Sequence, residues 1–166
     1  MPLYYTEDQA MLADTVTGFM ADEGGIKQQL RHFRDMDCKD GFGHALWKQF
    51  AEMGLTGMLA AEADGGLAMG HVEAGIVLKE IGRNLTPSPF LTTSVMGVTA
   101  LSGGSDDLRG RWLPGVIAGD SVLAIAIDES PKHRPERIAA RAEKAGNGFR
   151  LSGSKAFVVQ GASADA

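Results

Sequence analysis

The sequence predicts a mostly α-helical N-terminal domain followed by the first part of a β domain. Apolar residues recur at helical spacing through the first two thirds of the 166 residues. The pattern changes near Gly119-Asp120, after which β-branched residues form a short apolar run. A Gly-Asn-Gly turn then separates two further extended segments. Helices that come first and strands that come last are typical of an α+β fold or of two successive domains.

The first predicted helix begins at a capping box, in which Gln9 follows Thr6 by three residues. The apolar residues behind it share one helical face: Leu12, Val16, Phe19 and Met20. The pair Gly24-Gly25 marks its end, because consecutive glycines favour non-helical backbone.

The same spacing predicts further helices over 26–33, 45–53, 72–81, 95–101 and 108–112. Gly54 supplies a C-terminal glycine cap for one of them. Residues 62–66 form a loop, and Pro87 and Pro89 mark another. We expect Pro114 to end the last helix, because proline lacks an amide N–H and clashes with the preceding turn.

The strands follow. Ser121–Ile127 is apolar, β-branched and bounded by turn residues, which predicts a buried strand. Glu136–Ala145 is ambiguous, since its composition favours a helix while its alternation allows a strand. The turn at Gly146–Gly148 favours a hairpin, with Phe149–Val159 as the second extended arm.

Three strands without a closing element make a poor core. We therefore assign residues 1–118 to an N-terminal α-helical domain and residues 119–166 to the beginning of a truncated β domain. Open strand edges invite association, so we expect this chain alone to form oligomers or to be poorly soluble.

Composition excludes several function classes. The net charge of -5 and the pI of about 5.3 argue against nucleic acid as a partner. No apolar run approaches the ~20 residues of a membrane span, and the first residues lack the features of a signal peptide. The single cysteine, Cys38, excludes an internal disulfide and fits the cytoplasm. The four histidines show no zinc-type spacing, so we expect no metal site.

Five segments then point to a family. They are the Trp47 helix that leads to Gly54-Leu55, the acidic loop Ala61–Gly66, the helix Leu78–Arg83, the stretch Trp112–Asp120, and Gly148–Lys155. In this order, and over nearly the whole chain, they resemble the acyl-CoA dehydrogenase family. Each segment alone is a weak indication of the family, whereas all five in this order are specific for it.

The resemblance implies an N-terminal helical domain, a middle β domain and a C-terminal helical bundle, of which the third is absent here. It implies FAD as cofactor, an acyl-CoA thioester as substrate and an electron-transfer flavoprotein as partner, in fatty acid and lipid metabolism. It also implies a homo- or hetero-oligomer. In this family the catalytic base lies in the C-terminal domain, so no residue of this chain is assigned as catalytic.

The resemblance also implies positions for the cofactor. The family binds the flavin pyrimidine edge with a Thr-Glu pair at a strand end, and the matching positions are Asp128-Glu129, preceded by Ile125 and Ile127. Asp128 departs from the family threonine, because an ionised carboxylate accepts hydrogen bonds but donates none. A turn-forming role for Asp128-Glu129 is the alternative.

After Gly153-Ser154-Lys155 the family places an aromatic residue, a branched residue and a threonine against the flavin. The matches are Phe157, Val158 and Val159. Phe157 keeps a stacking surface, whereas Val159 has no hydroxyl to donate. The alternative is a plain core strand.

For the substrate, the resemblance points to Glu129 and to Ser130, where the family has a Gly-Ser-Asp loop. Here Ser130–Arg137 replaces that motif. From Pro131 to Arg150 there are six Lys and Arg residues against two Glu residues. Such a stretch is either a solvated loop or a surface for CoA phosphates or an acidic partner.

Three hypotheses follow. The chain is the N-terminal part of an acyl-CoA dehydrogenase, a non-catalytic subunit of a heteromeric acyl-CoA dehydrogenase, or a stand-alone helical interaction module. The departures at Asp128, Ser130–Arg137 and Val159 motivate the second. An unfinished β domain argues against the third. Without the base, we expect little or no dehydrogenase activity from these 166 residues alone.

Overall fold

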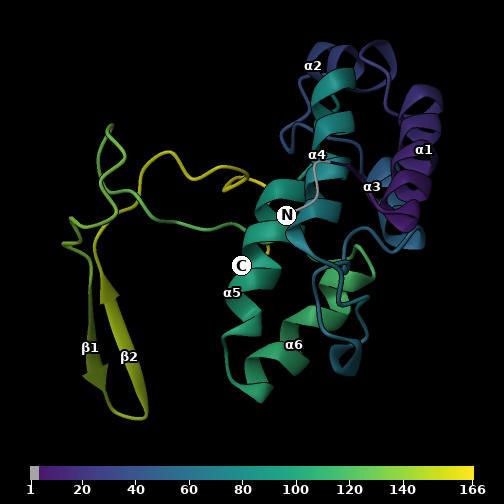
Figure 1. Ribbon diagram of the computed structural model, residues 1–166. Helices are drawn as coiled ribbons and strands as arrows, with labels where there is room; N and C mark the ends of the chain where they lie inside the picture. The colour runs from purple at the N-terminus through teal and green to yellow at the C-terminus, as the bar shows by residue number, and fades with distance from the viewer. Residues whose placement is uncertain (1–3) are drawn as a thin grey trace.

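The computed structural model describes residues 4–166 and shows a body of helices and an arm that ends in a β-hairpin (Figure 1). The body contains α1 (Glu7–Asp22), η1 (Lys27–Arg31), α2 (His32–Asp35), α3 (His44–Glu52), η2 (Glu62–Asp64), α4 (His71–Asn84), η3 (Phe90–Gly97), α5 (Val98–Ser102) and α6 (Asp106–Ile117). The arm (residues 125–160) carries β1 (Arg141–Ala145) and β2 (Gly148–Ser152). The predicted fold class, a helical domain followed by a partial β domain, is confirmed.

The aromatic residues of α3 form the centre of the core. Trp47 and Phe50 are almost fully buried, and their ring centroids lie 5.8 Å apart. Phe50 also packs edge-on against Phe19 of α1 at 5.7 Å and against Phe90 of η3 at 6.3 Å. Burial of each such ring stabilises the fold by about 1.5–3 kcal/mol. This packing fixes η3, a π-helical segment that lies between the core and the arm.

The predicted capping box at the start of α1 is confirmed. The Gln9 amide N–H donates to Thr6 Oγ1 over 3.2 Å, and the Thr6 amide donates to Gln9 Oε1 over 3.1 Å. Gln9 Nε2 also donates to Glu73 Oε1 over 2.7 Å, while Gly70 N donates to Glu73 Oε2 over 2.9 Å. The two long helices α1 and α4 are therefore joined at their N-terminal ends.

The expectation that Pro114 ends a helix is wrong, because α6 continues through it to Ile117. Leu113 and Val116, on either side of the proline, are 1% and 0% exposed. Thr56 Oγ1 donates to the Ile117 carbonyl over 2.7 Å and satisfies the helix end. Burial and capping thus offset the cost of an internal proline, which is about 3 kcal/mol.

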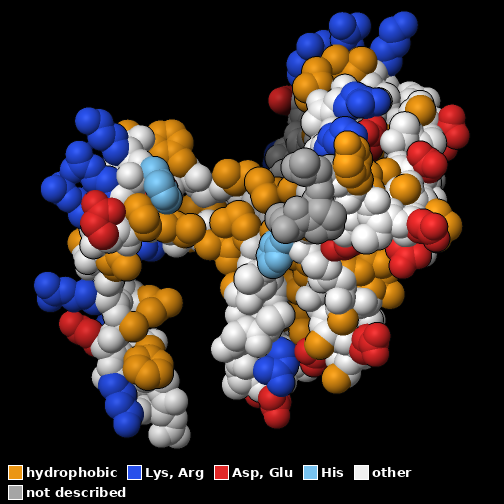
Figure 2. All heavy atoms as spheres, in the orientation of Figure 1, with side chains coloured by type: hydrophobic (Ala, Val, Ile, Leu, Met, Phe, Trp, Pro, Cys, Tyr) orange, Lys and Arg blue, Asp and Glu red, His pale blue; other side chains and the backbone are white. Residues whose placement is uncertain are grey.

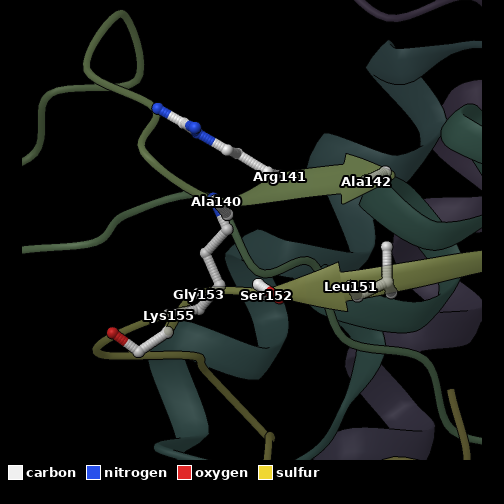
Figure 3. Close-up of a pocket in the computed structure, with 8 residues that line it drawn as sticks. Ala140, Arg141, Ala142, Leu151, Ser152, Gly153 and Lys155 are labelled. Atoms are coloured by element: carbon white, nitrogen blue, oxygen red, sulfur yellow. The ribbon is translucent and has the colours of Figure 1, made fainter. Parts of the chain in front are cut away.

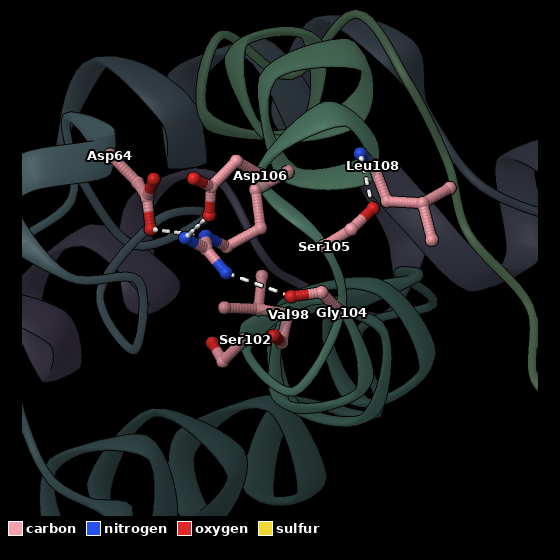
Figure 4. A network of polar contacts seen from close by, with 8 residues as sticks. Asp64, Val98, Ser102, Gly104, Ser105, Asp106 and Leu108 are labelled. Carbon is pink, nitrogen blue, oxygen red and sulfur yellow. Dashed lines mark hydrogen bonds and ion pairs between the residues drawn. The ribbon is translucent and has the colours of Figure 1, made fainter.

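Arg109 ties the start of α6 to the η2 loop (Figure 4). Its Nη1 donates to the Gly104 carbonyl over 2.8 Å, and its Nε lies 3.5 Å from Asp64 Oδ2. The same guanidinium pairs with Asp106. The acidic loop that leads to Gly65-Gly66 therefore has a structural role in the body.

The prediction of a buried strand over Ser121–Ile127 is wrong. The segment is extended but joins no sheet, and only Val122 and Leu123 are buried. A strand needs a ladder of backbone hydrogen bonds, and this segment makes only isolated ones, at Val122 and Ala124, with the last residues of the chain. Asp165 N donates to the Val122 carbonyl over 2.8 Å, and Val122 N donates to Asp165 Oδ2 over 2.8 Å.

The hairpin forms where the sequence predicts it, and Glu136–Ala145 is resolved in favour of a strand at its C-terminal end. In the antiparallel register Ala142 pairs with Leu151, and Lys144 pairs with Phe149. Side chains of directly opposite residues share a face of the hairpin. These four residues lie on one face, which is apolar except for Lys144. Leu151 is 79% exposed and Phe149 is 71% exposed, so the apolar face is uncovered.

The predicted strand at Phe157–Val159 does not form. These residues lie in a turn, and Phe157 has a left-handed backbone with φ 52°. Within residues 4–166, one backbone hydrogen bond connects the stretch just before it to the extended segment, from Ala156 N to the Asp128 carbonyl over 2.8 Å. A single bond does not make a ladder, which is why a β-prone sequence adopts a turn here.

Candidate functional site

An apolar cavity lies where the arm meets the body. It has a volume of about 230 Å³ and is lined by residues of η3, of the extended segment and of the turn: Leu91, Thr92, Met96, Ile125, Ile127, Asp128, His133, Ala156, Phe157 and Val159. Five of the six residues that sequence reasoning places at the flavin are in this set. The structure therefore brings together positions that are 34 residues apart in the chain, from Ile125 to Val159.

The extended segment is held against η3 by a buried threonine. Leu123 N donates to Thr93 Oγ1 over 3.0 Å, and Thr93 Oγ1 donates to the Leu123 carbonyl over 3.1 Å. A Cβ built on Gly97 would lie 2.9 Å from Leu123 Cβ, so only glycine allows this close approach. Met96 and Thr92, one helical turn apart, then face the arm.

Asp128 uses both of its carboxylate oxygens within the arm. His133 Nδ1 lies 2.9 Å from Oδ2, and Arg134 N donates to Oδ1 over 2.9 Å. The hydrogen bonds from His133 and from the Arg134 backbone lower the pKa of Asp128. The turn-forming interpretation of Asp128 thus has direct geometric support, and this carboxylate offers no donor to the cavity.

Glu129 holds three segments together. Its carboxylate accepts from Lys155 Nζ over 2.9 Å, from Ala139 N over 2.7 Å and from Ala140 N over 3.1 Å. The hydrogen bond from Lys155, followed by the two backbone N–H groups, lowers the pKa of Glu129 to about 2. Lys155 Nζ also donates to the Ile127 carbonyl over 3.0 Å. The side chain of Glu129 is therefore an anchor inside the arm.

A second depression, of about 460 Å³, lies beside this anchor. It is lined by the two residues predicted to meet the substrate and by the basic loop that follows: Glu129, Ser130, Pro131, Lys132, Arg134 and Arg137. The predicted substrate positions and the predicted flavin positions thus line two different hollows. They share the loop that runs from Asp128 to Arg134.

A third hollow, of about 380 Å³, lies at the root of the hairpin (Figure 3). Ala140, Ala142, Leu151 and Gly153 give it apolar walls, and Arg141, Ser152, Ser154 and Lys155 also line it. None of the predicted site residues lines it. It shares Ala142 and Leu151 with the uncovered apolar face of the hairpin.

Val158 is the one predicted flavin residue outside the apolar cavity. Phe157 and Val159 do line it, although they are 77% and 63% exposed. Sequence reasoning missed the contribution of η3, whose Thr92 and Met96 are four residues apart and share a helical face. It also missed His133, because zinc-type spacing does not detect a histidine that pairs with a nearby carboxylate.

The family model that describes the acyl-CoA dehydrogenase N-terminal domain matches residues 6–120. The chain belongs to the acyl-CoA dehydrogenase family. The chain is 30% identical to acyl-CoA dehydrogenase FadE27 of Mycobacterium tuberculosis, over 92% of this chain and 42% of the relative. The chain therefore spans about two fifths of the length of this curated relative.

Two similar solved structures support the family at the level of the fold and of the sequence. A variant of the Tcur3481-Tcur3483 steroid ACAD is 29% identical with a TM-score of 0.81, over 92% of this chain and 41% of that chain. The ChsE4-ChsE5 complex from Mycobacterium tuberculosis is 26% identical with a TM-score of 0.80, over 95% and 42%. This chain combines a helical domain with the start of a β domain.

Two further findings concern the described part, residues 4–166. No group of three or more His, Cys, Asp or Glu residues there is placed to hold a metal ion. None of the helices in this range has the length and the apolar character needed to cross a membrane.

Proposed function

We propose that this chain is the N-terminal portion of a flavin-dependent acyl-CoA dehydrogenase and forms one wall of the site where FAD and the acyl-CoA thioester meet. One observation carries the proposal. The cavity between η3 and the arm gathers five of the six positions that the family resemblance assigns to the flavin. Family membership makes this arrangement meaningful, because the same hollow in an unrelated fold would have no assigned ligand.

The residues present fit an aromatic ring system. Ile125, Ile127 and Val159 supply apolar walls, and the exposed ring of Phe157 supplies a flat surface for stacking. The backbone N–H groups of Ile127 and Asp128 donate to no acceptor within the described part of the chain, so they are free to meet the carbonyls of a pyrimidine edge. FAD, when bound, would supply the acceptor for the hydride that leaves the acyl chain.

The proposed role of this chain is to orient the flavin ring. We propose that Ile125, Ile127 and Phe157 hold the ring, and that Met96 and Leu91 close its other side and exclude water. No residue of this chain is proposed as the base that removes a proton. Electron-transfer flavoprotein remains our proposed electron acceptor, and an oligomer remains our proposed assembly.

A second candidate is a non-catalytic subunit of a heteromeric acyl-CoA dehydrogenase. Two observations favour it. Both carboxylate oxygens of Asp128 are occupied within the arm, and Val159 carries no donor. The two similar solved structures are named as pairs of chains. In this alternative the cavity is retained as part of the fold and takes no flavin.

We also propose the division between a helical domain at 1–118 and the start of a β domain at 119–166. The extended segment leaves the body just after this boundary. Because the sequence contains a single cysteine, we propose a reducing compartment, the cytoplasm, as the place where the protein works.

The test is retention of flavin by the purified chain. FAD is added in excess, unbound flavin is removed by gel filtration, and the absorption in the flavin bands is read. Phe157→Ala should lower the retained flavin, whereas the matched variant Phe149→Ala, an equally exposed ring on the hairpin, should not. A folded chain that retains no flavin contradicts the first candidate and favours the non-catalytic subunit.

A further inference from the structure

The loop from Asp128 to Arg137 lies between the apolar cavity and the larger depression. Lys132 and Arg134 line the larger depression, whereas His133, which lies between them in the sequence, lines the apolar cavity. Consecutive residues of one loop therefore line the two hollows. A ligand that carries an apolar end and a charged end would reach both by passing this loop.

The larger depression is strongly cationic. Lys132, Arg134 and Arg137 all line it, and none of them has an ion-pair partner among residues 4–166. Figure 2 shows Lys and Arg side chains gathered on the outer side of the arm. The one carboxylate that lines the depression, Glu129, is already neutralised by Lys155. Three uncompensated cations around one hollow are notable in a chain with a net charge of -5.

The loop is also held in place before any ligand arrives. Arg134 N donates to Asp128, and Arg137 N donates to the Arg134 carbonyl over 2.9 Å. Ser130 Oγ donates to the Lys132 carbonyl over 3.1 Å. A fixed loop loses little conformational entropy when a ligand binds, which favours a recognition site over a freely solvated stretch.

We propose that this depression binds the phosphate groups of a nucleotide-bearing ligand whose apolar end lies in the adjacent cavity. Guanidinium and ammonium groups are the usual protein partners of phosphate, and arginine binds it in a bidentate manner. Coenzyme A and FAD both carry nucleotide phosphates, so the shared chemistry is the phosphate. This inference deepens the proposed function and rests on it for the identity of the ligand.

The test measures binding of four probes to the full chain by calorimetry: pyrophosphate, coenzyme A, dephospho-coenzyme A and FAD. The double variant Lys132→Gln with Arg137→Gln removes two of the three cations. The matched control, Lys27→Gln with Arg31→Gln, removes the same charge from η1 in the body, where both side chains are exposed. Circular dichroism melting checks that both variants stay folded.

We expect the arm variant to bind at least one phosphate probe roughly tenfold more weakly or worse, with the body variant unchanged. Weaker binding of coenzyme A but not of FAD identifies coenzyme A as the source, and the reverse identifies FAD. A preference for coenzyme A over dephospho-coenzyme A places its 3′-phosphate in the depression. Equal weakening in both variants, or no binding of any probe to the wild-type chain, overturns the proposal.

The proposed flavin role and the proposed phosphate site can be refuted independently of each other. A chain that binds pyrophosphate through Lys132 and Arg137 but retains no flavin refutes the flavin role alone. A chain that retains flavin, but binds the phosphate probes equally well after substitution of Lys132 and Arg137, refutes the phosphate site alone.

Discussion

The Glu129 carboxylate holds residues 127–129, 139–140 and 155 in one arrangement. It does so as an anion, because its three partners are all donors. Glu129→Gln removes the charge and leaves an amide that cannot accept three such bonds. We expect faster hydrogen exchange at the Ala139 and Ala140 amides in this variant. Glu136→Gln, an exposed acid of the same loop, is the control and should leave both rates unchanged.

The same contacts predict the response to acid. The pKa of Glu129 falls from 4.5 to about 2, so its anchoring is complete above pH 4.5 and is lost as the pH falls toward 2. We expect the Ala139 and Ala140 amide resonances to stay constant through pH 4.5 and to move only in more acidic solution. A midpoint near 4.5, or the same titration in Glu129→Gln, would contradict the assignment.

A substitution at Val159 tests whether the family threonine, replaced here by valine, contributes to flavin binding. Val159→Thr restores a hydroxyl at a position that lines the apolar cavity. If FAD binds there, one new hydrogen bond of about 0.5–1.5 kcal/mol should tighten FAD binding roughly two- to tenfold. The measurement is quenching of flavin fluorescence on titration. Val158→Thr is the control, because Val158 does not line the cavity; an equal gain there would refute the contact.

At the scale of elements, Gly66 decides how the η2 loop packs on the body. A Cβ built on Gly66 would lie 2.2 Å from the Ala60 carbonyl oxygen, which is backbone and cannot move aside. Gly66→Ala should therefore destabilise the fold by about 1–3 kcal/mol or more.

Gly18→Ala is the matched substitution, because Gly18 lies in α1 with open space around it. It should stabilise the fold by about 0.5–1 kcal/mol through helix propensity. Chemical denaturation of both variants gives the comparison. A Gly66→Ala variant as stable as the wild type would show that the loop packs differently.

At the scale of the whole molecule, the arm projects from the body with one face of its hairpin uncovered (Figure 1). Exposed Phe149 and Leu151 beside two open strand edges favour association between chains. We expect wild-type chains to self-associate in light scattering. Phe149→Thr with Leu151→Thr should shift the distribution toward the monomer.

The control for this prediction is Met11→Thr with Met36→Thr, which removes two exposed apolar side chains from the body. This variant should associate as the wild type does. A wild-type chain that stays monomeric at all concentrations would show that the hairpin face does not drive association.

The helical body and the hairpin could be predicted from local features of the sequence. Both depend on local signals: the capping box at Thr6, the apolar spacing along α1 and α4, and the turn at Gly146–Gly148. These signals act between residues that are close in the chain, so they can be read from it directly. The ordered motifs also indicated the family that the match over residues 6–120 shows.

The remaining features depend on contacts between distant segments of the folded chain. Burial of Leu113 and Val116 carried α6 through Pro114, and backbone hydrogen bonds too few to form a ladder within residues 4–166 left Ser121–Ile127 and Phe157–Val159 outside any sheet. The contribution of η3 to the cavity depends on Thr93, which holds a segment thirty residues away. Strand pairing, core burial and cavity walls are set by partners distant in sequence, and these partners are known only once the chain is folded.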